Sequence, residues 1–148
     1  MALNLQIIHF RKFCDSGILQ QFSCPGTPQQ NGVVECKHRH LLNVARALRF
    51  QADLPLIFWG DRIPTATYLI NRTPSKILVG QTPYEKMYSH PPDFTHLRTF
   101  GCLCYASTSH DHPNKFEPRA RRCIFVGYPA GQKAFKLYDI DHHKFLII

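Results

Sequence analysis

The sequence predicts an α+β fold in which helices in residues 1–90 are followed by a small antiparallel sheet in residues 91–148. Apolar residues recur at three- and four-residue steps from Asn31 to Phe50, as in a helix that lies on a core. After His96, short apolar segments alternate with turn residues, and Pro91-Pro92 separates the two regions. With 148 residues, 44% of them apolar, the chain can bury one modest core or two small ones.

The first part of the chain is predicted to contain one long helix with short elements before it. A short helix ends near Asp15, and Ile18 to Ser23 alternates as a strand does. A loop from Pro25 to Pro28 then leads into a helix from about Asn31 to Phe50. The face of this helix that should meet the core carries Val34, Leu41, Ala45 and Leu48.

A second helix is predicted from Leu56 to Asn71. Asp53 is expected to cap it and Pro55 to lie in its first turn. Trp59 is expected in the core. Pro64 falls inside the helix and removes one backbone hydrogen bond, so we expect a kink or a break about two residues earlier.

The last part of the chain predicts four short strands separated by turns with Gly, Pro or Asp. This spacing is typical of a small antiparallel barrel. Because the last predicted strand ends with the sequence, we expect the barrel to be incomplete. The strands are expected at Leu97 to Ala106, Arg122 to Tyr128, Ala134 to Ile140 and Lys144 to Ile148.

The charge of the chain indicates a polyanionic partner. Lys and Arg number 18 against 10 Asp and Glu, a formal net charge of +8, which favours nucleic acid first and an acidic membrane surface second. No apolar run approaches the roughly 20 residues that span a bilayer, and we expect neither a signal peptide nor another targeting signal in this chain. Six scattered cysteines predict reduced thiols in an intracellular protein.

Two segments are candidates for contact with nucleic acid. Amide side chains precede the long helix and basic ones follow on it; Asn31 could instead cap the helix. The second segment, Lys115 to Arg122, is either a phosphate-binding loop or a merely solvated one. The candidates are Gln29, Gln30, Asn31, Lys37, Arg39, Arg46, Arg49, Lys115, Arg119, Arg121 and Arg122.

The long helix also carries a single acid, Glu35, among these basic residues. Glu35 and Arg39 are four residues apart, so a surface ion pair is one interpretation of this acid. The other interpretation is a functional carboxylate. The residue types alone do not choose between the two.

The run Thr-Pro-Gln-Gln-Asn-Gly-Val-Val-Glu at 27–35, followed by Lys-His-Arg-His and Ala-Arg-Ala-Leu, resembles the end of the catalytic core of an integrase from a copia-type LTR retrotransposon Pol polyprotein. The likeness continues through Tyr68–Pro74 and Thr82–Glu85. Leu97–Cys102 and Cys123–Tyr128 are similar to the SH3-like module that follows this core. The resemblance covers about Phe13 to Ile148 and implies that 1–90 is the C-terminal part of an RNase H-like core and 91–148 a partial SH3-like module.

The resemblance implies roles for particular residues. Glu35 matches the third acid of an Asp, Asp, Glu triad that holds two Mg²⁺ or Mn²⁺ ions for DNA strand transfer, a phosphoryl transfer. Cys36 stands where the family usually has arginine. Asp15 lies too close to Glu35 to match the second aspartate, and the first has no counterpart either.

From these matches we expect the isolated chain to be inactive and to bind no metal ion. Its parent enzyme is expected to act on DNA in the nucleus, together with other integrase subunits. Two alternatives remain open: a non-catalytic nucleic-acid-binding module, and a non-functional transposon remnant.

Overall fold

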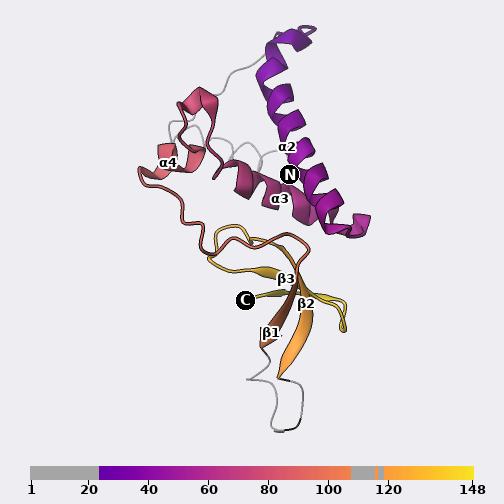
Figure 1. The fold of residues 1–148 in the computed structure, drawn as a ribbon. Coiled ribbons are helices and arrows are strands. Elements are labelled where there is room, and N and C mark those ends of the chain that lie inside the picture. Colours follow the sequence, from indigo (N-terminus) through magenta and orange to yellow (C-terminus); the bar gives the residue numbers. More distant parts are fainter. Residues whose placement is uncertain (1–23, 108–115, 117–118) are drawn as a thin grey trace, which may run out of the picture. The chain divides into compact units, whose positions relative to one another are not determined.

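The computed structural model describes residues 24–107, 116 and 119–148. The predicted helix ending near Asp15 and the strand Ile18–Ser23 lie outside these residues. Helices precede an antiparallel sheet in an α+β fold, as the sequence predicts (Figure 1). The elements in order are η1 (Pro28–Asn31), α2 (Gly32–Ala52), η2 (Leu56–Phe58), α3 (Trp59–Ile70), η3 (Lys76–Leu78), α4 (Pro83–Tyr88), β1 (Leu103–Ser107), β2 (Ala120–Gly127), β3 (Lys136–Asp139) and β4 (Lys144–Ile147).

The chain forms two compact units, Met1–Lys37 and His38–Ile148. In the second unit, one hydrophobic cluster joins Ala45 and Leu48 of α2 to Val126 of β2. Helices and sheet therefore share a core in this unit. The predicted boundary between the integrase-core part, 1–90, and the SH3-like module, 91–148, stays a prediction. Within the described residues, no helix has both the length and the apolar character needed to cross a membrane.

Helix α2 spans Gly32–Ala52, so it begins one residue later and ends two residues later than the predicted range of Asn31 to Phe50. Ala45 and Leu48 are buried as predicted, and Leu41 packs against them. Val34 is 54% exposed, so its predicted place in the core is wrong. The reason is that the core contacts of α2 begin only at Leu41, two turns further along.

The connection between α2 and α3 is held by a buried arginine that sequence reasoning missed. Arg62 is 3% exposed, and its Nη2 donates hydrogen bonds of 2.8 Å to the carbonyl oxygens of Leu54 and Pro55. Burial lowers the pKa of Arg62, and the charge of Arg49 lowers it further.

The predicted capping of the second helix by Asp53 is wrong, because Asp53 lies in the turn before η2 with a φ of 48°. Pro55 precedes η2 and does not lie in the first turn of a helix.

Helix α3 is continuous across Pro64, so of the predicted kink or break the break is wrong, and the kink stays a prediction. Trp59 is 63% exposed, which also contradicts its predicted core position. Its neighbour Phe58 takes that position instead. Phe58 is 5% exposed, and the centre of its ring lies 5.0 Å from that of Tyr138 on β3.

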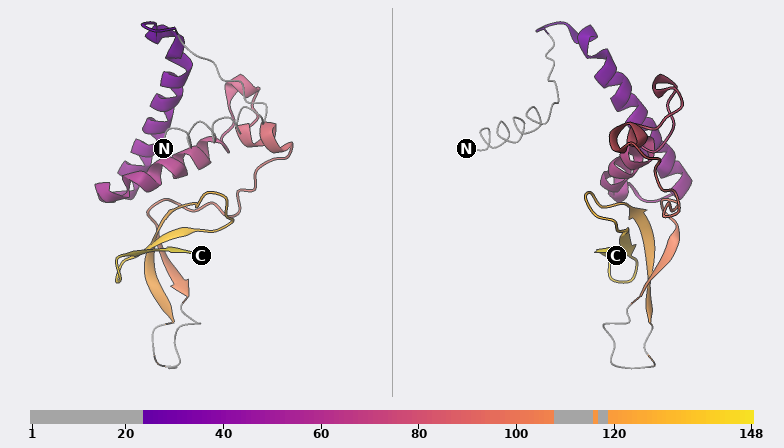
Figure 2. Two further views of the ribbon diagram at one scale, coloured as in Figure 1. Left: turned by 180° about the vertical axis from the view of Figure 1, so that it is seen from behind. Right: turned by 90° about the vertical axis from the view of Figure 1, so that its left-hand side faces the viewer.

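Figure 2 shows helix α3 next to one end of the sheet. Two glycines, one at the end of β2 and one in the segment before β1, let the helices pack closely there. A Cβ atom at Gly127, the last residue of β2, would lie 2.2 Å from Oγ1 of Thr65 on α3. A Cβ atom at Gly101 would lie 2.4 Å from the Cβ of Ala52 at the end of α2. Both glycines have positive φ angles, +131° and +83°, which other residues rarely adopt. These positions therefore require glycine both for space and for backbone conformation.

The sheet is an antiparallel meander in the order β1-β2-β3-β4. Three predicted strands agree with β2, β3 and β4 to within about two residues. The first strand begins at Leu103 and not at Leu97, because the chain before it turns and buries Phe100 against the helices. The described sheet is open, with β1 and β4 as its edges, and does not close into a barrel.

The turn between β3 and β4 is organised by a buried carboxylate. Asp139 is fully buried, and its Oδ1 accepts hydrogen bonds of 3.0 Å from the backbone N–H groups of Asp141 and His142. Its Oδ2 lies 3.0 Å from Nδ1 of His142. Burial acts to raise the pKa of Asp139, but the hydrogen bonds and charge of His142, with the N–H of Asp141, hold it below its ordinary value.

We therefore expect acid to destabilise the fold through Asp139. A carboxyl whose pKa is lower in the folded state adds stability above the pKa of an unfolded aspartate, about 3.9, and loses it as the pH falls through the folded pKa. Replacing Asp139 by Asn should lower the urea midpoint of unfolding near neutral pH and flatten its decline in acid. A variant whose midpoint still declined as steeply as that of the wild type would contradict this role.

Candidate nucleic-acid interface

Helix α2 carries three exposed arginines, Arg39, Arg46 and Arg49, which we call the arginine stripe. At 3.6 residues per turn, Arg39 and Arg46 lie within about 20° of each other around the helix axis, and Arg49 lies roughly 60° from Arg46. The guanidinium of Arg49 lies 5.9 Å from the ring centre of Phe50, which is also exposed. The periodicity that places Leu41, Ala45 and Leu48 toward the core leaves these arginines on the outer side.

Two further predicted residues of α2 lie in its first two turns. Glu35 is in the first turn and exposed, one turn before Arg39 on the same continuous helix. Lys37 is exposed as well, but lies about 160° from Arg39 around the helix axis. The periodicity of α2 thus groups Glu35 with the arginine stripe and leaves Lys37 outside it.

The polar residues before α2 build a local turn. Gln30 uses its side-chain oxygen to accept a hydrogen bond of 2.9 Å from the backbone N–H of Cys24. The hydroxyl of Thr27 donates to the carbonyl of Cys24 at 2.7 Å. Asn31 is the last residue of η1 and is exposed. Gln30 therefore stabilises the loop, while contacts of Gln29, Gln30 and Asn31 with DNA stay predictions.

Glu35 does not form a metal site with other described side chains. No group of three His, Cys, Asp or Glu side chains in residues 24–107, 116 and 119–148 is placed to hold a metal ion. A two-metal centre needs several carboxylates around both ions, so the described residues alone do not fit one. The role of Glu35 as a catalytic and metal-binding residue stays a prediction.

The described end of the second basic segment is partly a strand and not the predicted loop. Lys115 lies outside the described residues, and Arg119 is exposed just before β2. Arg121 and Arg122 belong to β2 itself, because they pair with Ala106 and Tyr105 of β1. Successive residues of a strand point to opposite faces, so these two arginines do not form one patch. Arg122 Nη2 also lies 2.8 Å from Oδ1 of Asp141, which raises the pKa of Arg122 and offsets its charge.

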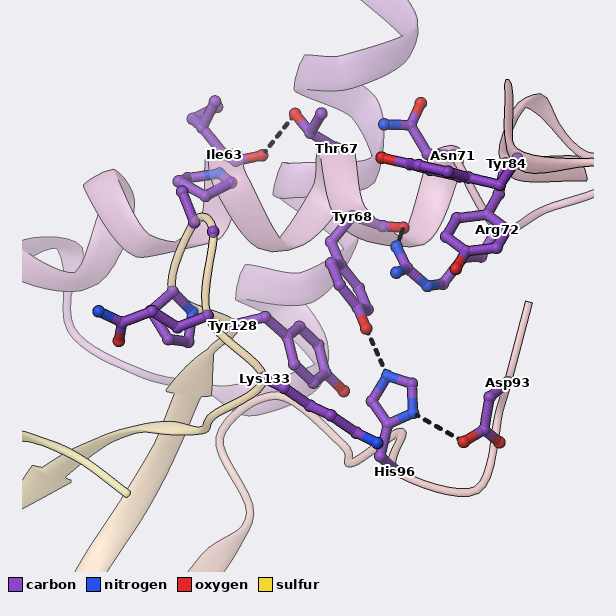
Figure 3. Close-up of a pocket in the computed structure, with 16 residues that line it drawn as sticks. Ile63, Thr67, Tyr68, Asn71, Arg72, Tyr84, Asp93, His96, Tyr128 and Lys133 are labelled. Atoms are coloured by element: carbon purple, nitrogen blue, oxygen red, sulfur yellow. Dashed lines mark hydrogen bonds and ion pairs between the residues drawn. The ribbon is translucent and has the colours of Figure 1, made fainter. Parts of the chain in front are cut away.

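Sequence reasoning missed a pocket lined by aromatic and basic side chains (Figure 3). Its volume is about 890 Å³. The guanidinium carbon of Arg72 lies 3.4 Å from the ring centre of Tyr68 and 4.9 Å from that of Tyr84. The pocket residues extend from Ile63 to Lys133, and only four-residue steps such as Tyr68 to Arg72 and Tyr84 to Tyr88 are visible as local patterns.

Comparisons with known proteins identify relatives of this chain. Residues 102–148 match the family model of the retroviral polymerase SH3-like domain. The chain is 35% identical over 137 residues to the retrovirus-related Pol polyprotein from transposon RE2 of Arabidopsis thaliana. These residues are 87% of this chain and 9% of the polyprotein. The chain is 36% identical over 141 residues to the retrovirus-related Pol polyprotein from transposon RE1 of the same plant. These residues are 90% of this chain and 10% of the polyprotein.

A third relative comes from tobacco. The retrovirus-related Pol polyprotein from transposon TNT 1-94 of Nicotiana tabacum is 36% identical over 131 residues, which are 88% of this chain and 10% of the polyprotein. This chain thus spans about a tenth of the length of the polyproteins it matches. No solved structure matches it.

Proposed function

Because this chain belongs to the family of Pol polyproteins from copia-type retrotransposons, with their SH3-like domain at residues 102–148, we propose that it is an integrase segment that binds DNA. The observation that carries this proposal is the arginine stripe on α2. Its three guanidinium groups are exposed, and none of them forms an ion pair with an acidic side chain among the described residues.

The stripe suits a DNA backbone for electrostatic and geometric reasons. Arg39 and Arg46 are seven residues apart, so their Cα atoms lie about 10 Å apart along the helix axis. Guanidinium groups at this separation can contact two different phosphates of one strand, and each contact releases condensed counterions. Such contacts carry no base information, so the stripe should bind duplexes of different sequence about equally well.

The proposed role of Glu35 is to supply one carboxylate to an integrase centre completed by residues outside the described ones. Two divalent ions at such a centre would polarise the scissile phosphate and activate the attacking group. In this role the partners of the protein are DNA and other integrase subunits, in the nucleus where chromosomal DNA is held.

The substitution Glu35→Gln separates the enzymatic role from the binding role. In a Pol protein that contains this segment together with its preceding catalytic residues, we expect the change to abolish Mg²⁺-dependent strand transfer and to leave DNA affinity unchanged or slightly higher. A higher DNA affinity would follow from the removal of a negative charge beside the arginine stripe. Strand transfer that persisted in Glu35→Gln would favour a non-catalytic nucleic-acid-binding module.

A further inference from the structure

We propose that the pocket between α3, α4 and the segment 128–133 binds a phosphate of a single-stranded nucleic acid, with an unpaired base on Tyr88 at its rim. The pocket shares no residue with the arginine stripe. The proposal rests on the proposed function for the class of ligand, nucleic acid, but assigns it a second site. The residues that the argument uses are Arg72, Tyr84, Tyr88, Asp93, His96 and Lys133.

Two buried side-chain nitrogens in this pocket lack a hydrogen-bond partner. Of the three buried side-chain nitrogen or oxygen atoms without a hydrogen bond among the described residues, two are Nε of Arg72 and Nδ1 of His96. Nε2 of His96 is engaged with the hydroxyl of Tyr68 (Figure 3). If that hydroxyl is the donor, the imidazole proton lies on Nδ1. Both orphan atoms are then donors. Nδ1 of His96 faces the carboxylate of Asp93, so Nε of Arg72 is the donor that an anionic group in the pocket would satisfy, since buried donors normally find an acceptor.

Arg72 is held in place without an acidic partner among the described residues. Its Nη1 donates to the carbonyl oxygen of Tyr68 at 3.2 Å, and its guanidinium lies over the rings of Tyr68 and Tyr84. Tyr68 in turn stacks on Tyr128, with ring centres 4.0 Å apart and planes 17° apart. A planar cation that is fixed by rings and keeps unused donors is well suited to a phosphate. Lys133, at the end of the segment 128–133, lines the same pocket and adds a second positive charge.

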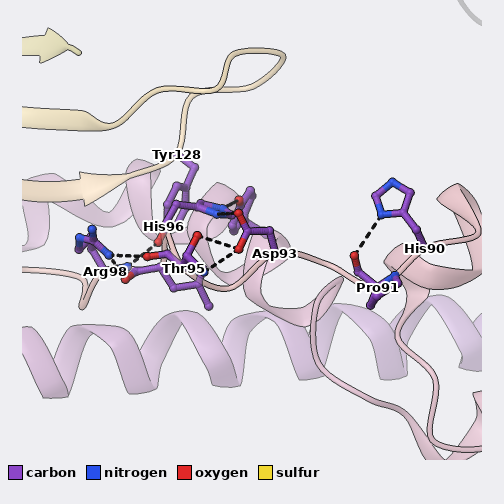
Figure 4. Close-up of polar contacts among 9 residues, drawn as sticks. His90, Pro91, Asp93, Thr95, His96, Arg98 and Tyr128 are labelled. Carbon is purple, nitrogen blue, oxygen red and sulfur yellow. Dashed lines mark hydrogen bonds and ion pairs between the residues drawn. The ribbon is translucent and has the colours of Figure 1, made fainter.

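Asp93 is the negative group that faces these donors. Its Oδ2 lies 3.7 Å from Nδ1 of His96, too far for a hydrogen bond. Its Oδ1 accepts from the backbone N–H and hydroxyl of Thr95 at 2.8 and 2.7 Å (Figure 4). These bonds hold the pKa of Asp93 below its ordinary value, so the carboxylate stays charged. A phosphate would therefore bind nearer to Arg72 and Lys133, and removal of the Asp93 charge would strengthen its binding.

The rim of the pocket favours a strand with unpaired bases. Tyr88 is 53% exposed, and its ring centre lies 4.6 Å from that of Tyr84, which contacts Arg72. An exposed tyrosine next to a phosphate-binding cation can stack a base of the same strand. The bases of a duplex are already stacked on one another, so this contact is open to a single strand only.

The test measures the affinity of the full chain for a fluorescent oligothymidine strand and for a duplex of the same length. We expect Lys133→Gln to weaken single-strand binding about tenfold and Tyr88→Leu by at least about fivefold, with duplex binding unchanged. Asp93→Asn should strengthen single-strand binding. Lys76→Gln, which removes an exposed charge away from the pocket, is the matched control and should change neither affinity.

Three results would overturn the proposal. Lys133→Gln and Tyr88→Leu could bind the single strand as tightly as the control does, or they could weaken binding of the single strand and of the duplex equally. The third is that inorganic phosphate competes for the site as well as an unlabelled oligonucleotide does. If duplex binding still depended on the arginine stripe in that case, only the proposal of a single-strand site in the pocket would have failed. Loss of all DNA binding by the wild type would remove the proposed function as well. Equal urea midpoints for all variants exclude unfolding as the cause of a lost affinity.

Discussion

Gly101→Ala is expected to lower the free energy of unfolding by about 2–5 kcal/mol. The new methyl group would lie 2.4 Å from the Cβ of Ala52, which cannot rotate away, and 3.2 Å from the Ala52 Cα. Overpacking of this kind costs about 1–3 kcal/mol, and a positive φ adds about 1–2 kcal/mol for a residue with a side chain. The measurement is the free energy of unfolding from a urea titration.

Gly80→Ala is the matched control for this experiment. Gly80 has a φ of +82°, almost the same as the +83° of Gly101, but a Cβ atom there would meet nothing within 4 Å. The control should therefore lose only the backbone contribution, about 1–2 kcal/mol. If both variants were destabilised equally, the close packing of the end of α2 against the segment before β1 would be contradicted.

The triple substitution Arg39→Gln, Arg46→Gln and Arg49→Gln is expected to weaken duplex DNA binding at about 0.1 M salt by about 100-fold or more. Each phosphate contact contributes roughly a factor of ten to the affinity at this salt concentration through counterion release, and the three arginines are exposed on one side of α2. Fluorescence anisotropy with a labelled duplex measures the change.

A second triple variant controls for the loss of net charge. Lys76→Gln, Lys86→Gln and Lys144→Gln also remove three positive charges from exposed side chains, starting from the same formal charge of +8. This variant should lose much less affinity, because its lysines lie on η3, α4 and β4 and not on the stripe. Equal losses for the two variants would mean that net charge alone draws the protein to DNA.

The sequence predicted those elements whose pattern is local. Helix α2 follows from a 3.6-residue repeat that the core at Ala45 and Leu48 enforces, and β2 to β4 follow from alternating segments between turns. The same rules misplaced Trp59 and missed Arg62. A large aromatic residue was expected in the core, but Trp59 is exposed. Arg62 is buried because it donates to the carbonyl oxygens of Leu54 and Pro55, a tertiary contact of the α2–α3 connection that no local pattern marks.

The candidate sites divide in the same way. The arginine stripe could be predicted because residues on one helix keep their relative positions wherever the helix lies. The second basic segment could not, since pairing with β1 turns Arg121 and Arg122 to opposite faces. The pocket at Arg72 brings together α3, α4 and the segment 128–133, and no local pattern encodes such an arrangement.

The dependence of duplex affinity on salt tests the proposed DNA binding most directly. Three phosphate contacts predict that the logarithm of the association constant falls with the logarithm of salt concentration at a slope of about −3, and that the arginine-stripe variant has a slope close to zero. A wild-type affinity that did not change between about 50 and 200 mM salt would contradict phosphate binding by this helix.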